Sequence, residues 1–528
     1  MFRTYLAALL MLPAVLLAQS IPVTTAQYDN ARTGANVSET VLTPQNVNSN
    51  QFGKRFALSV DGDVYAQPLY VPGVEIPGKG THDVVFIATE HDTVYAFDAQ
   101  GNPSAPLWQA SFLTADGTIS TVPGQDVECP FIKPEIGITS TPVIDLKTGT
   151  LYVLARSREY KATLRGYDYV QRLHALAITT GAEKMSSVVI DASVPGRGTG
   201  SAGGQIRFNP LRENPRAALL LVNGLVYLTW ASSCDVGPYH GWVMAYDALT
   251  LEQKGALNVS PDAGEGGIWA GDSGPAADAA GSVFVATGNG KFDAASAGGR
   301  DYGDSVLKLA LSNQGFALQD FFTPFNQQEL NDNDADLGSG GPVLLPDQPG
   351  PHSHLLVLAG KGGVIYLLDR DRLGKYGPTT KAGPVQTITA TADAYGAMAY
   401  WNQHLYFLCS RDHLRDFVVE HGQLILKAVA QGAKFSDPGA TPTVSSNGSK
   451  NGIVWVIATK TWNGGDRAAV LHAYDAATLH EIYSSDENSG RDGAGKALRF
   501  TVPTVANGRV YIGAKGEVDV YGVSTPGR

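Results

Sequence analysis

The chain has 528 residues, 43% of them hydrophobic, and its 39 Lys and Arg against 50 Asp and Glu give a net charge of −11. An acidic chain without a basic cluster argues against nucleic acid or an anionic membrane surface as partner. The 60 glycines exceed the usual share and are typical of a chain with many tight turns.

The N-terminus has the pattern of an export signal. A basic start at Arg3 is followed by the compact apolar stretch Tyr5–Leu17, and Ala18 precedes Gln19 at a plausible cleavage site. The apolar stretch is too short to span a bilayer, and nothing later approaches the length of a spanning helix. We therefore predict a signal peptide at 1–18, an N-terminal segment at 19–51, a periplasmic or secreted location and no membrane span.

The rest of the chain repeats one unit about eight times: an apolar run, a short turn, and a second run ending in aromatic, Asp and a small residue. Clear copies are DVVFIATEHDTVYAFDA, GWVMAYDALT, GGVIYLLDRD and AVLHAYDAATL. The runs are short, rich in Val, Ile, Tyr and Leu, and bounded by turn residues, which predicts strands. The units lie near Gln67–Ala110, Thr139–Ile190, Asn214–Val259, Trp269–Leu311, Leu337–Arg372, Ala394–Leu426, Gly439–Tyr483 and Phe500–Val523.

Such an array of antiparallel sheets must protect its edges, and closure into a ring leaves only short ones. The last unit stops without an outer strand, whereas Phe52–Val60 is a strand without a unit. We predict an all-β chain, an eight-bladed β-propeller of four-stranded antiparallel blades over 52–528, closed where Phe52–Val60 pairs beside Phe500–Val523.

The cysteines do not predict a disulfide framework, because Cys129, Cys234 and Cys409 are far apart and odd in number. No cysteine follows the expected cleavage site, so we do not expect a lipid anchor either.

From YDNARTGAN at Tyr28 onward, the chain resembles exported bacterial PQQ-binding-like propellers, which are related to the quinoprotein alcohol dehydrogenases. The resemblance rests on DGDVYAQPLYVPGV, PEIGITSTPVID, GPYHGWVMAYD, GGIWAGDSGPAAD, VFVATGNG, RDYGDSVLKL and DADLGSGGP. It implies the propeller fold, with pyrroloquinoline quinone (PQQ) and Ca²⁺ as the cofactors to be tested. It does not by itself identify a reaction, because function belongs to sites grafted on folds.

The resemblance also implies site residues. Asn289, in the triplet Thr287-Gly288-Asn289, and Asp235, before GPYHGW, correspond to metal ligands, and Ca²⁺ favours such oxygens. Trp269 corresponds to the tryptophan on which the quinone lies. Thr139 and His240 are expected beside the cofactor at the channel. Taken singly, each of these residues would also suit a turn or a blade core.

Two acidic features leave alternatives open. Asn331–Asp336 resembles a calcium loop, but it lacks the Gly and Glu that an EF-hand requires, so an acidic loop is the favoured interpretation, with an incidental Ca²⁺ site as the alternative. Glu135 stands just before a strand and is a further acid that the channel would accommodate.

The position of the general base departs from the dehydrogenase pattern. Where the dehydrogenases have a carboxylate after DSVLKL, this chain has Ala310-Leu311-Ser312-Asn313, and loss of a positioned base costs about 10²–10⁴ in rate. Asp301 and Asp304 are the nearby acids, with Asp304 the better catalytic candidate, although solvated turn carboxylates are the favoured interpretation of both. The sequence therefore favours a non-catalytic propeller that binds an unknown protein or small-molecule ligand at its face, with a PQQ- and Ca²⁺-dependent oxidoreductase as the alternative.

Overall fold

The computed structural model describes residues 21–524 except 272, 378–382, 391, 433, 461 and 463–465. The predicted signal peptide at 1–18 lies outside the described residues. Within the described part, no helix is both long and apolar enough to cross a membrane.

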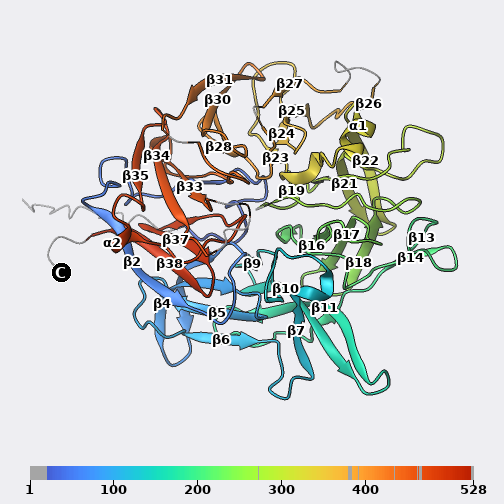
Figure 1. Ribbon diagram of the computed structural model, residues 1–528, viewed down its shortest axis with the longest axis horizontal. Helices are drawn as coiled ribbons and strands as arrows, with labels where there is room; N and C mark the ends of the chain where they lie inside the picture. The colour runs from blue at the N-terminus through green and yellow to red at the C-terminus, as the bar shows by residue number, and fades with distance from the viewer. Residues whose placement is uncertain are drawn as a thin grey trace, which may run out of the picture.

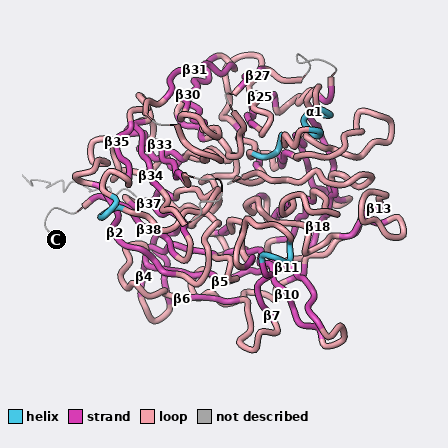
Figure 2. Tube along the Cα trace, in the orientation of Figure 1, coloured by secondary structure: helices cyan, strands magenta, loops and turns pink. Residues whose placement is uncertain are grey.

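Eight antiparallel sheets are arranged as blades around a central channel (Figure 1), and strands and loops make up nearly all of the chain (Figure 2). Blades 1 to 4 are β3 (Leu69–Ile76), β4 (Gly80–Ala88), β5 (Thr93–Asp98) and β6 (Trp108–Ser111); β9 (Val143–Asp145), β10 (Thr150–Lys161), β11 (Gly166–Ala177) and β12 (Val188–Val189); β15 (Leu220–Val222), β16 (Leu225–Trp230), β17 (Trp242–Asp247) and β18 (Gln253–Asn258); and β19 (Ala276–Ala277), β20 (Val283–Ala286), β21 (Val306–Ser312) and β22 (Gly315–Thr323).

Blades 5 to 8 complete the ring. They are β23 (Val343–Leu344), β24 (Leu355–Ala359), β25 (Val364–Asp369) and β27 (Gln386–Thr389); β28 (Ala399–Trp401), β29 (His404–Phe407), β30 (Arg415–Glu420) and β31 (Gln423–Val429); β32 (Thr443–Asn447), β33 (Lys450–Ala458), β34 (Val470–Asp475) and β35 (Glu481–Ser484); and β36 (Thr504–Ala506), β37 (Arg509–Ala514), β38 (Glu517–Val523) and β2 (Phe52–Ser59). The remaining elements are β1 (Ala35–Asn36), β7 (Ile119–Pro123), β8 (Glu135–Ile136), β13 (Ser193–Pro195), β14 (Gln205–Arg207), β26 (Lys375–Tyr376), α1 (Gln327–Asp332), α2 (Ser489–Asp492) and the 3₁₀ turns η1 (Gly124–Val127) and η2 (Leu337–Ser339).

The predicted ring closure is confirmed. The N-terminal strand β2 pairs antiparallel with β38, with Phe52 opposite Val523 and Ser59 opposite Glu517. In Figure 1 the blue β2 lies beside the red β38. Blade 8 is therefore built from both ends of the propeller, and β2 covers the outer edge of β38.

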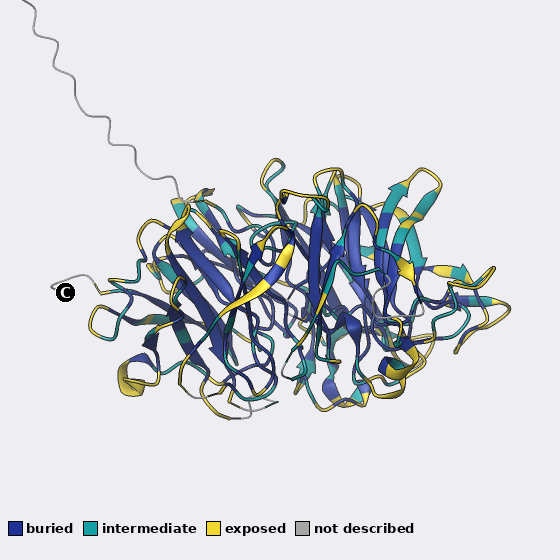
Figure 3. Cartoon of the chain, turned by 90° about the horizontal axis from the view of Figure 1, so that it is seen from above, coloured by how far each residue is buried: buried dark blue, intermediate teal, exposed yellow. Residues whose placement is uncertain are grey.

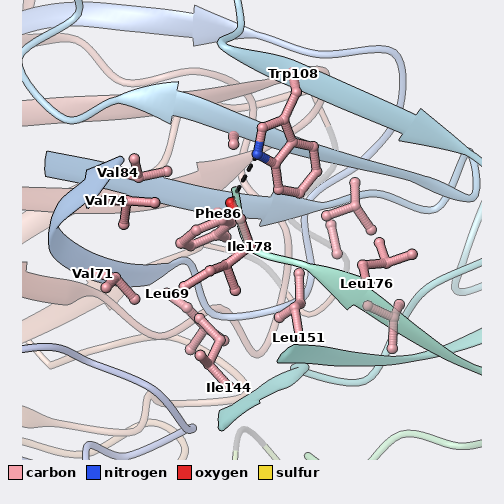
Figure 4. Close-up of a cluster of buried hydrophobic side chains, with 14 of the residues drawn as sticks. Leu69, Val71, Val74, Val84, Phe86, Trp108, Ile144, Leu151, Leu176 and Ile178 are labelled. Carbon is pink, nitrogen blue, oxygen red and sulfur yellow. Dashed lines mark hydrogen bonds between the residues drawn. The ribbon is translucent and has the colours of Figure 1, made fainter. Parts of the chain in front are cut away.

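Apolar side chains between neighbouring blades form the cores. Between blades 1 and 2, for example, Trp108 packs near Phe86 and donates its Nε1–H to the carbonyl oxygen of Ile178 at 2.9 Å (Figure 4). The polar end of a buried indole usually finds such a partner. In the side view the strands are mostly buried and exposure is concentrated in the loops (Figure 3). Those loops are where a binding site can form without disturbing the blades.

Candidate functional site

A cavity of about 420 Å³ lies on the axis of the ring, because seven of the eight blades contribute to its wall. Most of the contributing segments stand just before the innermost strand of a blade. The lining residues are Val127, Cys129, Phe131, Ile132, Ile136, Asn214, Arg216, Ser232, Ser233, Cys234, Asp235, Trp269, Gly271, Asp334, Asp336, Ser339, Lys361, Tyr395, Trp462, Arg499 and Phe500. A second, more open cavity of about 810 Å³ adjoins it and shares Asp235.

A disulfide forms part of the cavity wall. Cys129 and Cys234, which are 105 residues apart, are bonded, whereas Cys409 is buried and reduced. The expectation that the cysteines form no disulfide framework was wrong, since the loop after β7 and the β16–β17 loop meet at the channel. The bond lies directly before Asp235, whose backbone, like that of Cys234, has φ of 54°. It therefore helps to hold this acid in an unfavourable conformation at the cavity.

Asp235 and Trp269, two of the predicted site residues, line the same cavity. Asp235 is exposed, and its Oδ1 accepts a 2.6 Å hydrogen bond from the hydroxyl of Tyr239. The half-buried Trp269 comes from the segment between blades 3 and 4, and its Nε1 is buried without a hydrogen-bond partner. Side chains from the β16–β17 loop and from the segment between blades 3 and 4 thus line one cavity.

Asn289 does not line the cavity, but it contacts two acids that do. Its Nδ2 donates to Asp334 Oδ1 at 2.6 Å, and its backbone N–H donates to Asp336 Oδ1 at 2.8 Å. Its Oδ1 is buried without a partner. The acidic loop at Asn331–Asp336 is therefore part of this site, where it covers the turn after β20.

Asp336 and Lys361 form the central ion pair of the cavity. Lys361 Nζ lies 2.5 Å from Asp336 Oδ2 and 3.0 Å from Asp334 Oδ1. Burial raises the pKa of Asp336 to about 6 although Lys361 opposes the shift. Burial alone would lower the pKa of Lys361, but its two carboxylate partners raise it overall. At neutral pH the lysine is charged and the Asp336 carboxylate is ionised.

Cations and aromatic rings form another part of the wall. The Arg499 guanidinium lies 3.8 Å from the centroid of the Phe131 ring and 5.2 Å from that of Trp462, and Arg216 lies 4.4 Å from that of Phe500. Such cation–π contacts hold a guanidinium in place without neutralising it. The cavity consequently combines flat apolar surface with charged side chains of both signs, because Asp235, Asp334 and Asp336 line it as well as the cations.

Asp301 and Asp304 are both fully buried, so the expectation that they are solvated turn carboxylates was wrong. Asp304 accepts hydrogen bonds from the backbone N–H of Leu337 at 3.1 Å and from Gln327 Nε2 at 3.2 Å. Burial raises its pKa to about 7. It supports the segment after the acidic loop and does not line the cavity. Its catalytic role stays a prediction without geometric support.

The other predicted residues lie close to the channel but away from the main cavity. Thr139 donates to Glu90 Oε1 at 2.8 Å and borders a small void deeper in the channel. His240 is buried, with its ring nitrogens 3.0 and 2.9 Å from the carbonyl oxygens of Ser260 and Thr199. Glu135 pairs with His91 at 2.8 Å. Their side chains are occupied by structural contacts.

Sequence reasoning missed Asp336 and Lys361 as a pair, and it missed both arginines. The pair joins the acidic loop to the turn between β24 and β25, and only the placement of blade 5 brings these segments together. The calcium-loop pattern at Asn331–Asp336 was the one signal that pointed to this place.

PQQ is a flat aromatic tricarboxylate, and the cavity suits it. An indole, further aromatic rings and three cationic side chains surround enough volume for a ligand of that size. Calcium fits less well, because no group of three or more His, Cys, Asp or Glu side chains in the described residues is arranged to hold a metal ion. Lys361 already neutralises charge on Asp334 and Asp336, where a metal ion would otherwise bind. Asn289 Oδ1 has no hydrogen-bond partner and is one oxygen that could coordinate a cation.

No protein-family model matches the chain, and no curated protein is significantly similar to it in sequence. Solved structures do share the fold. The quinohemoprotein alcohol dehydrogenase of Comamonas testosteroni aligns with a TM-score of 0.59 at 15% identity, covering 96% of this chain and 81% of that one. The quinohemoprotein alcohol dehydrogenase ADHIIG of Pseudomonas putida HK5 aligns with a TM-score of 0.60 at 14% identity and the same coverage. A europium-containing methanol dehydrogenase aligns with a TM-score of 0.57 at 13% identity, covering 95% and 98%. At these identities the similarity establishes the fold, an eight-bladed propeller like that of the quinoprotein alcohol dehydrogenases.

Proposed function

We propose that the protein is an exported, periplasmic or secreted quinoprotein oxidoreductase that holds PQQ in the axial cavity and oxidises an alcohol or a sugar there. The observation that carries the proposal is the Asp336–Lys361 pair in the same cavity as Trp269. The sequence favoured a non-catalytic protein because no carboxylate follows DSVLKL, where the dehydrogenases have their general base. Asp336 is a carboxylate in the cavity that supplies this function from another position.

Binding follows from the shape and charge of the wall. Trp269 offers a π face to a flat ring system, for which stacking contributes about 0.5–1.5 kcal/mol beyond the buried area. The guanidinium groups of Arg216 and Arg499 lie in the wall where they can meet the carboxylates of the ligand, and Arg is well suited to planar recognition of carboxylates. When bound, the quinone supplies a two-electron acceptor.

The chain itself supplies the proton acceptor. Asp336 is buried, ionised at neutral pH and close to its pKa, which is the range in which a general base works best. We assign its Oδ2 to accept the proton of the substrate hydroxyl, while Lys361 holds the carboxylate in place. Asn289 and Asp235 would be the residues nearest to a bound Ca²⁺. The proposed proton transfer does not require this ion.

The test is turnover by the purified protein. Protein loaded with PQQ, with and without Ca²⁺, should reduce an artificial electron acceptor when given alcohols or sugars, and Asp336→Asn should abolish turnover while PQQ stays bound. Retained activity in Asp336→Asn would contradict the assignment of the base to Asp336, and no turnover on any substrate with PQQ demonstrably bound would contradict the oxidoreductase assignment.

A non-catalytic propeller that binds a protein or small ligand at the channel face is the second candidate. It is favoured by Ala310-Leu311-Ser312-Asn313, which stands where the dehydrogenases have a carboxylate. PQQ binding without turnover supports this candidate, whereas turnover rejects it.

A further inference from the structure

The N-terminal segment Val23–Asn36, which contains the YDNARTGAN motif, runs across one end of the channel (dark blue in Figure 1). It makes hydrogen bonds to all eight blades and meets them in their order around the ring. Those bonds join Val23 to Tyr70, Thr24 to Ile144, Asn30 to Leu221 and Ala277, Ala31 to Leu344, Thr33 to Tyr400, Gly34 to Val444, and Asn36 to Val505. All but two of these contacts are backbone to backbone.

Arg32 fixes the middle of the segment. Its side chain is fully buried, and Nε donates to the Pro275 carbonyl at 2.9 Å and Nη2 to the Leu219 carbonyl at 3.0 Å. Nη1 donates to Thr25 Oγ1 at 2.7 Å and to the Ala26 carbonyl at 2.8 Å, which folds the segment back on itself. One guanidinium thus ties the segment to blades 3 and 4, and a buried charge is tolerated only with such partners.

A glycine allows the segment to pass close to blade 6. Gly34 has φ of 71°, and a Cβ at this position would lie 2.8 Å from Gln27 Oε1 and 3.1 Å from Ala399 Cβ. No other residue fits this conformation and this approach without strain. The path of the segment is therefore specified by its own sequence.

The segment and the axial cavity occupy opposite ends of the same strands. Cavity residues such as Gly271, Ser339 and Tyr395 precede the innermost strands β19, β23 and β28, whereas the segment bonds to residues five or six positions further along. The segment therefore lies beyond these residues from the cavity, toward the other end of the channel.

We propose that Val23–Asn36 is a plug that closes this end of the channel, so that the cavity exchanges its ligand only through the opposite mouth, beside Asp235 and Asp334. The structural role of the plug does not depend on the proposed function. The direction of ligand exchange does rest on the proposed function, because it assumes that the cavity binds PQQ. The ring closure by β2 does not require the plug, because β2 follows it in the chain and pairs with β38.

The first experiment separates the plug from the propeller after folding. A protease site is inserted in the full chain between Asn50 and Gln51, which are both exposed, and the folded protein is cleaved there. The fragment ending at Asn50 should stay bound through gel filtration and leave only in denaturant. A fragment that separates at once under native conditions would overturn the proposal.

The second experiment opens the plug. After the same cleavage, Arg32→Ala should release the fragment, whereas Arg55→Ala, an exposed arginine on β2, should retain it. With the fragment gone, bound PQQ should dissociate at least about tenfold faster, because a second exit raises the dissociation rate. An unchanged rate would refute exchange through one mouth. If PQQ does not bind at all, the proposed function fails, and fragment retention still decides the plug.

Discussion

Lys361 Nζ lies 2.5 Å from Asp336 Oδ2 on the axis of the ring, where a buried carboxylate and a half-buried ammonium share one cavity with Trp269. The carboxylate is nearly fully buried, and Asn289 donates a backbone hydrogen bond to its other oxygen. Both oxygens are therefore held in a fixed orientation. Such preorganisation is what a catalytic carboxylate requires.

We expect Asp336→Asn to lower kcat by about 10²–10⁴, because the amide keeps the shape of the side chain but accepts no proton. Steady-state rates with PQQ-loaded protein measure the effect, and PQQ titration checks that binding is kept. Asp332→Asn, on the exposed end of α1, is the matched control and should be silent. Asp304→Asn should keep turnover. If Asp304→Asn lost turnover while Asp336→Asn stayed fully active, the general base would be Asp304.

The activity should depend on pH through Asp336. The pKa of this carboxyl is raised to about 6 by burial, and its deprotonated form is the proton acceptor, so kcat/KM should rise as pH increases through about 6 and then level off. Lys361→Met removes the opposing charge and should move this inflection to higher pH. A profile that is flat from pH 5 to 8 in the wild type would contradict the assignment.

The Cys129–Cys234 disulfide should stabilise the fold as well as the cavity wall. Replacing both cysteines with serine should lower the free energy of unfolding by about 2–5 kcal/mol, because the bond closes a long loop in the unfolded chain. Denaturant unfolding of the double variant measures this. Thiol titration of the denatured, unreduced wild type should detect only the thiol of Cys409, and three reactive thiols would show that the bond is absent.

Ring closure should contribute strongly to stability. Phe52 on β2 is fully buried and its ring lies 4.9 Å from that of Tyr483 and 5.5 Å from that of Trp455, centroid to centroid. Phe52→Ala should cost about 3–5 kcal/mol of unfolding free energy. Arg55→Ala, exposed on the same strand, should change stability little, and equal effects of the two variants would argue against closure by β2.

The fold was predictable because each blade repeats a local pattern that fixes its own strands. The unmatched strand at Phe52–Val60 also predicted the closure, and β2 pairs with β38 as expected. The disulfide was not predictable, because Cys129 and Cys234 are brought together only by the neighbouring positions of blades 2 and 3.

The site was predictable only in part. Asp235 and Trp269 were found because the resemblance to the quinoprotein dehydrogenases implied them as site residues. Asp336 was missed because we expected a general base after β21. The ring instead brings Asp336, in the loop before β23, to the axis. The Gly-rich sequence around Asp304 gave no sign that its side chain is buried. Its partners Gln327 and Leu337 come from the segment that connects blades 4 and 5.

The most direct test of the account is a crystal structure of the protein grown with PQQ. We predict the quinone ring against the indole of Trp269, with its carboxylates near Arg216 or Arg499 and Asp336 facing the reactive edge. The same crystals of Trp269→Ala should show the cavity without the quinone. A wild-type cavity that stays empty at saturating PQQ, or a quinone bound elsewhere on the ring, would contradict the central claim.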